Sequence, residues 1–233
     1  MLITGASSGV GEAAAIAFAK RGADVAFTYQ KNEVGANKVA ESIRTIGKKA
    51  LVLKANLRNE DDAQVSVEET LRTFGRIDIL VNNAGRYVEG DEWNAPSSIW
   101  TESLEQNLIS VLNVSKYVLL HFESRKDGVM VNIASRHGVS GVYDAISYGA
   151  AKAGVINITE AYAKLMKGYG RANCISPSAI NTGYWLTAPK EELEDAVATR
   201  GGRLLEPSDV VEKILYLASD EAKDITGMNL VVE

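Results

Sequence analysis

Apolar residues along the chain gather in short runs, and longer stretches with helical spacing lie between these runs. Most of the runs are unbroken and do not alternate with polar residues, which is typical of parallel strands covered on both faces. The pattern predicts strands over residues 2–4, 24–29, 50–54, 77–81, 129–134, 171–175 and 229–232.

The stretches between the strands have the three- to four-residue spacing of apolar positions that is typical of amphipathic helices. Gly22, Gly47 and Gly75 follow three of them, at positions where a helix commonly ends on a left-handed residue. Pro207 marks the start of another, because proline is favoured in the first turn. One stretch, 98–124, is long enough for two helices. The predicted helices cover residues 9–21, 33–47, 60–74, 98–124, 146–168 and 207–219.

Strands and helices that alternate in this way predict a doubly wound α/β fold, with a seven-stranded parallel sheet and helices on both faces. No linker or repeat divides the sequence, so we expect a single domain over residues 1–233. The first and last strands are short, and we expect both to pair in the sheet, the first of them centrally. Ligands of such sheets bind at the carboxyl ends of the strands.

Composition and charge exclude several classes of function. The 25 basic and 30 acidic residues give a net charge of -5, which disfavours nucleic acid as a main partner. A single cysteine, Cys174, excludes an internal disulfide, and with only two histidines a zinc site is not expected. No run of 18 apolar residues suggests a membrane span, so we expect a cytoplasmic protein.

Residues 4–11, Thr-Gly-Ala-Ser-Ser-Gly-Val-Gly, join the first predicted strand to the first helix. Glycines there let the backbone turn tightly and approach a pyrophosphate, which the helix N-terminus attracts. A phosphate-binding P-loop is excluded because no Gly-Lys-Ser/Thr follows. Residues 5–9 also fit the Gly-x-Ser-x-Gly elbow of hydrolases, but no upstream loop precedes them to supply an oxyanion donor. A plain glycine turn remains the third interpretation.

A second group of residues carries candidate chemistry. Tyr148 and Lys152 are four residues apart on a predicted helix, which puts phenol and ammonium on one face. A cation beside a tyrosine hydroxyl lowers the phenol pKa and makes it usable as an acid or base. Ser135 directly follows a predicted strand, where it is placed to hydrogen-bond a substrate oxygen. Taken alone, the Tyr/Lys pair also fits a solvated helix face.

Together these residues resemble the short-chain dehydrogenase/reductase family, over essentially the whole chain. The family's Thr-Gly-x-x-x-Gly-x-Gly loop matches residues 4–11, and its Asn-Asn-Ala-Gly motif matches residues 82–85. Its helix asparagine matches Asn107, and its serine and Tyr-x-x-x-Lys pair match Ser135 and residues 148–152. The chain is most similar to 3-oxoacyl-(acyl-carrier-protein) reductases.

The resemblance implies a Rossmann-type fold and metal-independent hydride transfer between a nicotinamide and a carbonyl or alcohol carbon. Tyr148 would be the general acid/base, Lys152 would lower its pKa and hold the nicotinamide ribose, and Ser135 would polarise the substrate oxygen. Asn107 would hold a water that relays protons to Lys152. The cofactor-binding residues that it implies are Gly5, Ser7, Ser8, Gly9, Val10, Gly11, Tyr29, Lys31, Asn56, Leu57, Asn83, Ala84, Gly85, Tyr148, Lys152, Pro177, Ile180 and Thr182.

The end of the second strand favours NADP(H) over NAD(H), which remains the alternative. NAD-specific sites usually have an acid there to hold the ribose 2′-hydroxyl. This chain has Tyr29 instead, with Lys31 nearby to attract a 2′-phosphate. Two positions depart from the family pattern: Asn56 replaces an adenine-contacting Asp, and Ser178 replaces the Gly after the family proline. Neither belongs to the four catalytic positions.

In members of this family, the segment that corresponds to residues 183–205 largely determines substrate specificity. It contains Tyr184 and Trp185, followed by a helix-like acidic stretch, which fits either a mobile lid or a packed surface helix. We expect Ser135, Tyr148, Tyr184 and Trp185 to contact a small carbonyl or alcohol substrate, including an acyl thioester on acyl carrier protein.

Two further functions remain open, a sugar or polyol dehydrogenase of the same family and a non-catalytic dinucleotide-binding regulator. The resemblance also implies a homotetramer.

Overall fold

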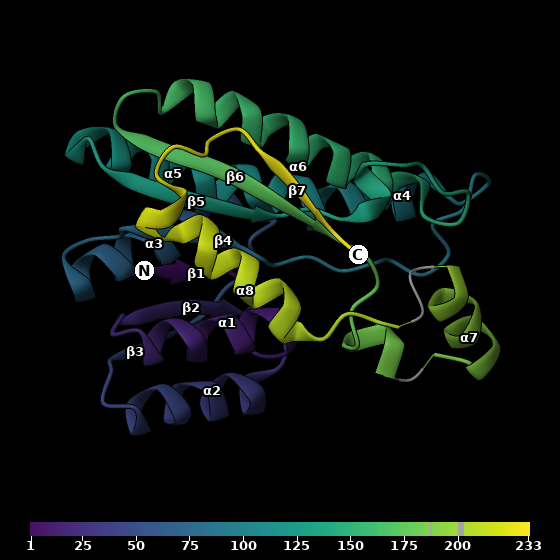
Figure 1. Cartoon of the computed structure of the whole chain (residues 1–233), viewed down its shortest axis with the longest axis horizontal. Coiled ribbons are helices and arrows are strands. Elements are labelled where there is room, and N and C mark those ends of the chain that lie inside the picture. Colours follow the sequence, from purple (N-terminus) through teal and green to yellow (C-terminus); the bar gives the residue numbers. More distant parts are fainter. Residues whose placement is uncertain (187, 200–202) are drawn as a thin grey trace.

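The computed structural model describes residues 1–186, 188–199 and 203–233, and within them it contains one seven-stranded parallel sheet (Figure 1). The strand order is β3-β2-β1-β4-β5-β6-β7, which confirms the doubly wound, Rossmann-like arrangement. The strands are β1 (Leu2–Ile3), β2 (Val25–Tyr29), β3 (Ala50–Lys54), β4 (Ile79–Asn82), β5 (Gly128–Ile133), β6 (Gly170–Pro177) and β7 (Asn229–Val232).

The helices follow the predicted pattern with one clear difference. The long stretch predicted at 98–124 is divided by a turn of π-helix, η1, so that two α-helices flank it. In the described part of the chain, no helix has the length and apolar character that crossing a bilayer requires. The helical elements are α1 (Gly9–Lys20), α2 (Glu33–Thr45), α3 (Glu60–Phe74), α4 (Ser97–Leu104), η1 (Glu105–Ile109), α5 (Ser110–Arg125), η2 (Arg136–Gly138), α6 (Ile146–Leu165), η3 (Gly183–Leu186), α7 (Lys190–Thr199), α8 (Pro207–Ala218) and η4 (Asp220–Ala222).

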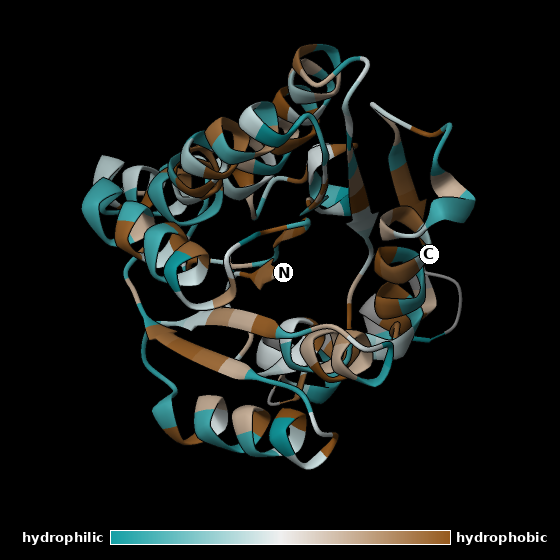
Figure 2. Ribbon diagram, turned by 90° about the vertical axis from the view of Figure 1, so that its left-hand side faces the viewer, coloured by the Kyte–Doolittle hydropathy of each residue, from teal (hydrophilic) through white to brown (hydrophobic). Residues whose placement is uncertain are grey.

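The sheet is covered on both faces by helices. Helices α1, α2 and α8 enclose one buried apolar core, and α3, α5 and α6 enclose the other on the opposite face (Figure 1). In Figure 2 the helices carry both hydrophobic residues (brown) and hydrophilic residues (teal). This mixture is typical of helices that pack one side against a sheet and expose the other. Helix α7 stands apart from these layers, at the right of Figure 1.

The two-residue strand β1 lies at the centre of the sheet. Leu2 pairs with Ala26 of β2 on one side and with Leu80 of β4 on the other, and Leu2 and Ile3 are fully buried. At the far edge, β7 pairs with β6 over four residues. The expectation that both end strands join the sheet, the first centrally, is therefore confirmed.

The chain order reverses at β1 and β4, because β2 and β3 lie on one side of this pair and β5 to β7 on the other. In open parallel sheets, the loops after the strands at such a reversal form the ligand-binding crevice. The loops after β1 and β4 contain the glycine-rich segment 4–11 and the Asn-Asn-Ala-Gly segment 82–85. The fold therefore brings the two motifs to the same edge of the sheet.

Gly128, the first residue of β5, sits against the ring of Phe122 at the end of α5. A Cβ added to Gly128 would overlap three ring carbons of Phe122, which is fully buried. We expect Gly128→Ala to lower the free energy of unfolding by roughly 1–3 kcal/mol, because the buried ring or the strand must shift to make room for the methyl group. Urea denaturation measures this change.

Gly141→Ala is the matched control, because a Cβ at Gly141 meets no heavy atom within 4 Å. It should change stability by less than about 0.5 kcal/mol. If both substitutions changed the free energy of unfolding equally, the contact between Gly128 and Phe122 would not be the cause of the loss.

Candidate functional site

Thr4 and Asn83 tie the two motif loops together where β1 and β4 end. The Thr4 hydroxyl accepts hydrogen bonds from the backbone N–H groups of Asn83 (3.0 Å) and Ala84 (2.9 Å). In return, the Asn83 amide Nδ2 donates to the carbonyl oxygens of Thr4 (3.0 Å) and Gly5 (2.9 Å). Each loop thus satisfies polar groups of the other, which fixes their spacing.

Close packing requires the glycine at position 5, and a left-handed backbone favours glycine at positions 5 and 9. Gly5 has φ +66°, and a Cβ on it would lie 2.8 Å from the Cα of Ala84. Gly9 has φ +61°, and a Cβ there would lie 3.4 Å from the Cγ2 of Thr182, a residue that follows β6. Segments after β1, β4 and β6 therefore meet at these glycines.

The N-terminus of α1 lies in this loop and fits an anionic ligand. The residue before the helix, Ser8, has extended backbone, and among the described residues it makes no side-chain capping bond. The first backbone N–H groups of a helix have no partner inside the helix, and its dipole is positive there. Val10 and Gly11 are buried in the first turn, while Ser7 and Ser8 lie nearer the surface. A pyrophosphate would satisfy this end of the helix.

The end of β2 supports the same loop. The Thr28 hydroxyl accepts the Gly5 N–H at 3.1 Å. The side chain of Asn32 donates to the Ser7 carbonyl (3.1 Å) and accepts the Gly35 N–H (3.0 Å), so it links the glycine loop to the start of α2. Neither role was predicted. For Asn32 the signal is its place directly before a helix, because asparagine is a favoured N-cap residue.

The residues predicted to determine cofactor specificity and to contact the adenine lie at or just after the ends of β2 and β3. Tyr29 is buried at the end of β2, and Lys31 is exposed. After β3, Asn56 is half-buried, and its side-chain oxygen accepts from Arg58 at 3.2 Å. Leu57 is buried beside it.

Ser135, Tyr148 and Lys152 come together at the end of β5. Tyr148 and Lys152 lie on α6, and the Lys152 Nζ is 5.7 Å from the centre of the Tyr148 ring. The same Nζ donates to the carbonyl oxygen of Ile133 at 2.9 Å and is almost completely buried. Ser135 follows β5 directly, and its hydroxyl accepts the His137 N–H at 3.2 Å. The solvated-face interpretation of the Tyr/Lys pair is therefore wrong for Lys152.

Burial controls the protonation of this pair. It raises the pKa of the Tyr148 phenol above its ordinary value of 10.0, while a hydrogen bond with Ser135 acts in the lowering direction. It also lowers the pKa of Lys152 from 10.5 to about 8, because the charged form loses its hydration. Lys152 was expected to lower the tyrosine pKa, but burial has the largest effect on Tyr148 and the lowering contribution comes from Ser135.

Asn107 lies in the π-helical turn η1, fully buried, with its side chain held by the chain after β4. Its Oδ1 accepts the Arg86 N–H (2.9 Å), and its Nδ2 donates to the Arg86 carbonyl (2.8 Å) and the Ser103 carbonyl (3.0 Å). A Cβ on Gly85 would lie 2.7 Å from Asn107 Oδ1 and 3.2 Å from Lys152 Nζ. The predicted Asn107, Gly85 and Lys152 are therefore close neighbours.

The rim after β6 contains the remaining predicted residues. Pro177 ends β6, and Ile180 forms an isolated parallel bridge with Leu205. The N–H of Trp185 donates to the Thr182 carbonyl at 3.2 Å, and Trp185 is half-buried. The Tyr184 side chain and residues 187 and 200–202 of the expected substrate segment lie outside the described residues. Whether α7 acts as a lid stays a prediction.

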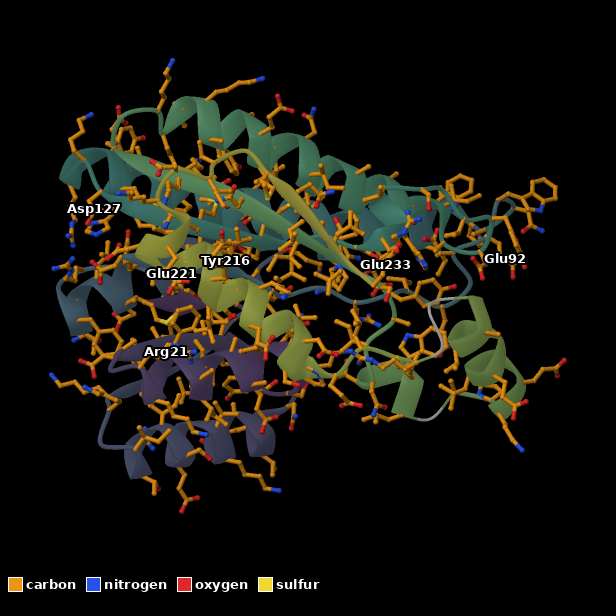
Figure 3. All side chains as sticks on the ribbon, viewed as in Figure 1. Arg21, Glu92, Asp127, Tyr216, Glu221 and Glu233 are labelled. Carbon is orange, nitrogen blue, oxygen red and sulfur yellow. The ribbon has the colours of Figure 1, made fainter. Side chains whose placement is uncertain are left out.

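Two aromatic rings, those of Tyr87 and His137, stand edge-on to Tyr148. The ring centre of Tyr87 lies 6.2 Å away, and that of His137 lies 6.0 Å away. Next to His137, Arg136 forms an ion pair with Glu233 at 2.8 Å, and Figure 3 shows Glu233 toward the end of the molecule where α7 and Glu92 lie. Among the described residues, no group of His, Cys, Asp or Glu side chains is arranged to hold a metal ion.

The buried ammonium of Lys152 makes a testable contribution to stability. Between pH values of about 8 and 10.5, the unfolded lysine binds more protons than the folded one, so this group makes stability rise with pH across that window. Lys152→Met removes the group. The stability of the Met variant relative to the native chain should therefore fall by roughly 3 kcal/mol from neutral pH to the top of the window. Urea denaturation of both chains across this range measures the difference, and a difference that does not depend on pH would contradict a buried charge.

Comparisons with known proteins agree with this geometry. A family model described as enoyl-(acyl carrier protein) reductase matches residues 5–233. The chain is 34% identical over 236 residues to the (2S)-[(R)-hydroxy(phenyl)methyl]succinyl-CoA dehydrogenase subunit BbsD of Thauera aromatica, covering 99% of this chain and 93% of that protein. It is 34% identical over 235 residues to the 3-oxoacyl-[acyl-carrier-protein] reductase FabG of Thermotoga maritima, covering 100% of this chain and 95% of that protein.

A solved structure of NAD+-bound xylitol dehydrogenase superposes with a TM-score of 0.93 at 27% identity, and the match covers 99% of this chain and 96% of that one. The matches extend over nearly the full length of the chain and include both the glycine loop and the Tyr148–Lys152 helix. The chain therefore belongs to the short-chain dehydrogenase/reductase family, and it is an oxidoreductase that acts on alcohol or carbonyl substrates.

Proposed function

We propose that this protein reduces a carbonyl group to a secondary alcohol, or the reverse, with NADP(H) as the hydride carrier and Tyr148 as general acid/base. The observation that carries the proposal is the meeting of Ser135, Tyr148 and buried Lys152 at the edge of the sheet where the open N-terminus of α1 also lies. We further propose that residues 1–233 form one dinucleotide-binding domain.

Several parts of the site would hold the cofactor. The glycine loop and the first turn of α1 would bind the pyrophosphate, Leu57 and Asn56 would lie toward the adenine, and the segment 83–85 would line the path toward the nicotinamide. Pro177, Ile180 and Thr182 would close the nicotinamide end. When bound, the cofactor supplies or accepts the hydride, and the protein supplies orientation and electrostatics.

Proton transfer is the part of the reaction that the chain's own residues perform. The Tyr148 phenol, whose pKa burial raises above its ordinary value of 10.0, is protonated at neutral pH and would donate its proton to a carbonyl oxygen. Ser135 would hold that oxygen by a hydrogen bond. Lys152, with a pKa of about 8, is mostly charged at neutral pH and would stabilise the phenolate that forms. Asn107, next to Lys152, would help return the proton through water.

The substrate class that the relatives favour is a β-oxoacyl thioester. The names of the Thermotoga and Thauera relatives both specify an acyl group on a carrier protein or on coenzyme A. Half-buried Trp185 on η3 supplies an apolar surface at the rim for such a chain. The xylitol dehydrogenase neighbour supports the second candidate, a polyol or sugar dehydrogenase.

A regulator without turnover is the third candidate, and the complete set of Asn107, Ser135, Tyr148 and Lys152 argues against it. Assays with NADPH and NADH against β-oxoacyl thioesters, diketones and sugars separate the three. Turnover with thioesters supports the proposal, turnover with sugars alone supports the second candidate, and cofactor binding without any turnover supports the third.

We also propose a homotetramer. Leu120 on α5 is 61% exposed and Leu165 on α6 is 59% exposed. In the proposed tetramer, a neighbouring copy would cover these apolar side chains. Sedimentation equilibrium tests this assignment, and a monomer at micromolar concentration would contradict it.

Tyr148→Phe removes the proton donor and keeps the ring. We expect kcat to fall by about 10²–10⁴-fold while cofactor affinity stays unchanged. Steady-state kinetics and fluorescence titration with NADPH measure the two quantities. Tyr162→Phe, on the same helix, is the control and should retain native kcat. Native activity in Tyr148→Phe would refute the acid/base assignment.

Lys31→Ala tests the choice of cofactor. An exposed lysine that contacts a 2′-phosphate contributes a charge-assisted hydrogen bond, so its loss should raise the KM for NADPH roughly tenfold and leave that for NADH unchanged. Lys38→Ala on α2 is the control, since Lys38 is also exposed. An unchanged ratio of the two KM values in Lys31→Ala would point to NAD(H) as the cofactor.

A further inference from the structure

Asp91 is a fully buried carboxylate in the loop between β4 and α4, and its side chain lies at the N-terminus of α6. Its Oδ1 accepts hydrogen bonds from the Ser147 N–H (3.0 Å) and the Ser147 hydroxyl (2.6 Å). Its Oδ2 accepts the Tyr148 N–H at 2.7 Å, and its backbone carbonyl accepts the Ile146 N–H at 3.2 Å. The first three N–H groups of α6 therefore all donate to one residue that is distant in the sequence.

This contact replaces an ordinary helix cap. The residue before α6 is Ala145, which has no side-chain oxygen, so the helix cannot be capped from its own sequence. A buried carboxylate is costly unless hydrogen bonds and positive charge compensate it. Among the described residues, Asp91 forms no ion pair with a lysine or arginine, so the N–H groups and the positive end of the α6 dipole compensate its charge.

The same loop also packs against the ring of Tyr148. Tyr87 stands edge-on to that ring, and its hydroxyl donates to the Asp144 carbonyl at 2.9 Å, just before α6. The loop thus contacts Tyr148 at two places, the backbone through Asp91 and the ring through Tyr87. Its beginning, at Gly85, lies against Asn107 and Lys152.

We propose that Asp91 is a positioning residue for the reaction: it fixes the backbone of Tyr148 and thereby sets where the phenol hydroxyl stands relative to Ser135 and Lys152. This inference rests on the proposed role of Tyr148 as general acid/base. Reacting groups are sensitive to such placement, because a shift of about 1 Å can cost roughly 100-fold in rate. Asp91 itself touches neither the phenol oxygen nor the glycine loop in the bonds that hold it.

Asp91→Asn tests the proposal, because it places an amide NH2 against N–H donors at one of the two oxygens. We expect kcat to fall about 10–100-fold and the KM for NADPH to change less than about twofold, since the glycine loop is not touched. Ser147→Ala removes only the hydroxyl contact and should lower kcat by a smaller factor. It provides a second test if Asp91→Asn does not fold.

Asp24→Asn is the matched control. Its Oδ1 also accepts a backbone N–H, that of Lys49 at 2.9 Å, but it precedes β2, at the amino ends of the strands. It should keep native kcat. All variants are assayed well below their unfolding temperatures, so that loss of folded protein does not enter the rates.

Hydrogen exchange at the amides of Ser147 and Tyr148 gives a readout that needs no substrate. We expect slow exchange in the native chain and faster exchange in Asp91→Asn. If the native chain shows this protection but turns over no substrate, the proposed function fails and the cap remains. If exchange accelerates while kcat in both Asp91→Asn and Ser147→Ala stays native, Asp91 is a structural cap only and the positioning role is wrong.

Discussion

The pairing of β1 with both β2 and β4 is the constraint on which the site depends. Only Leu2 and Ile3 form β1, yet they pair with a strand on each side. This pairing brings the carboxyl ends of β1 and β4 together. Thr4 and Asn83 then join the two loops through four hydrogen bonds. If β1 and β4 were not paired in this register, the glycine loop after β1 would not lie beside the segment after β4. Gly85 of that segment lies against Asn107 and Lys152.

Burial shifts the pKa values of both Tyr148 and Lys152, the pair that we propose as catalytic. Taking Lys152 out of water lowers its pKa to about 8, and taking Tyr148 out of water raises the pKa of the phenol. Burial therefore moves the two pKa values apart, so that at neutral pH Tyr148 keeps its proton and Lys152 stays mostly charged. The carbonyl of Ile133 and the hydroxyl of Ser135, both at the end of β5, hold them in place.

Local patterns allowed the strands and most helix positions to be predicted, because each depends on neighbours within a few residues. The site role of the Tyr148–Lys152 pair came from the family resemblance, because its spacing alone also fits a solvated helix face. The π-helical turn around Asn107 was not predicted, since its apolar spacing also fits a continuous helix. Asp91 gave no signal either: it caps a helix that begins 55 residues later, and only the folded chain brings the two together. The direction of the Tyr148 pKa was wrong for a related reason, because burial cannot be weighed against a nearby charge until packing is known.

The most direct test of the account is to follow the hydride itself. NADPH that carries deuterium at the transferable C4 position is incubated with the protein and a β-oxoacyl thioester, and the product is examined by mass spectrometry. We expect a β-hydroxyacyl thioester with one deuterium on the β-carbon. A thioester that is recovered unreduced and without deuterium, under conditions where NADPH is bound, would contradict it.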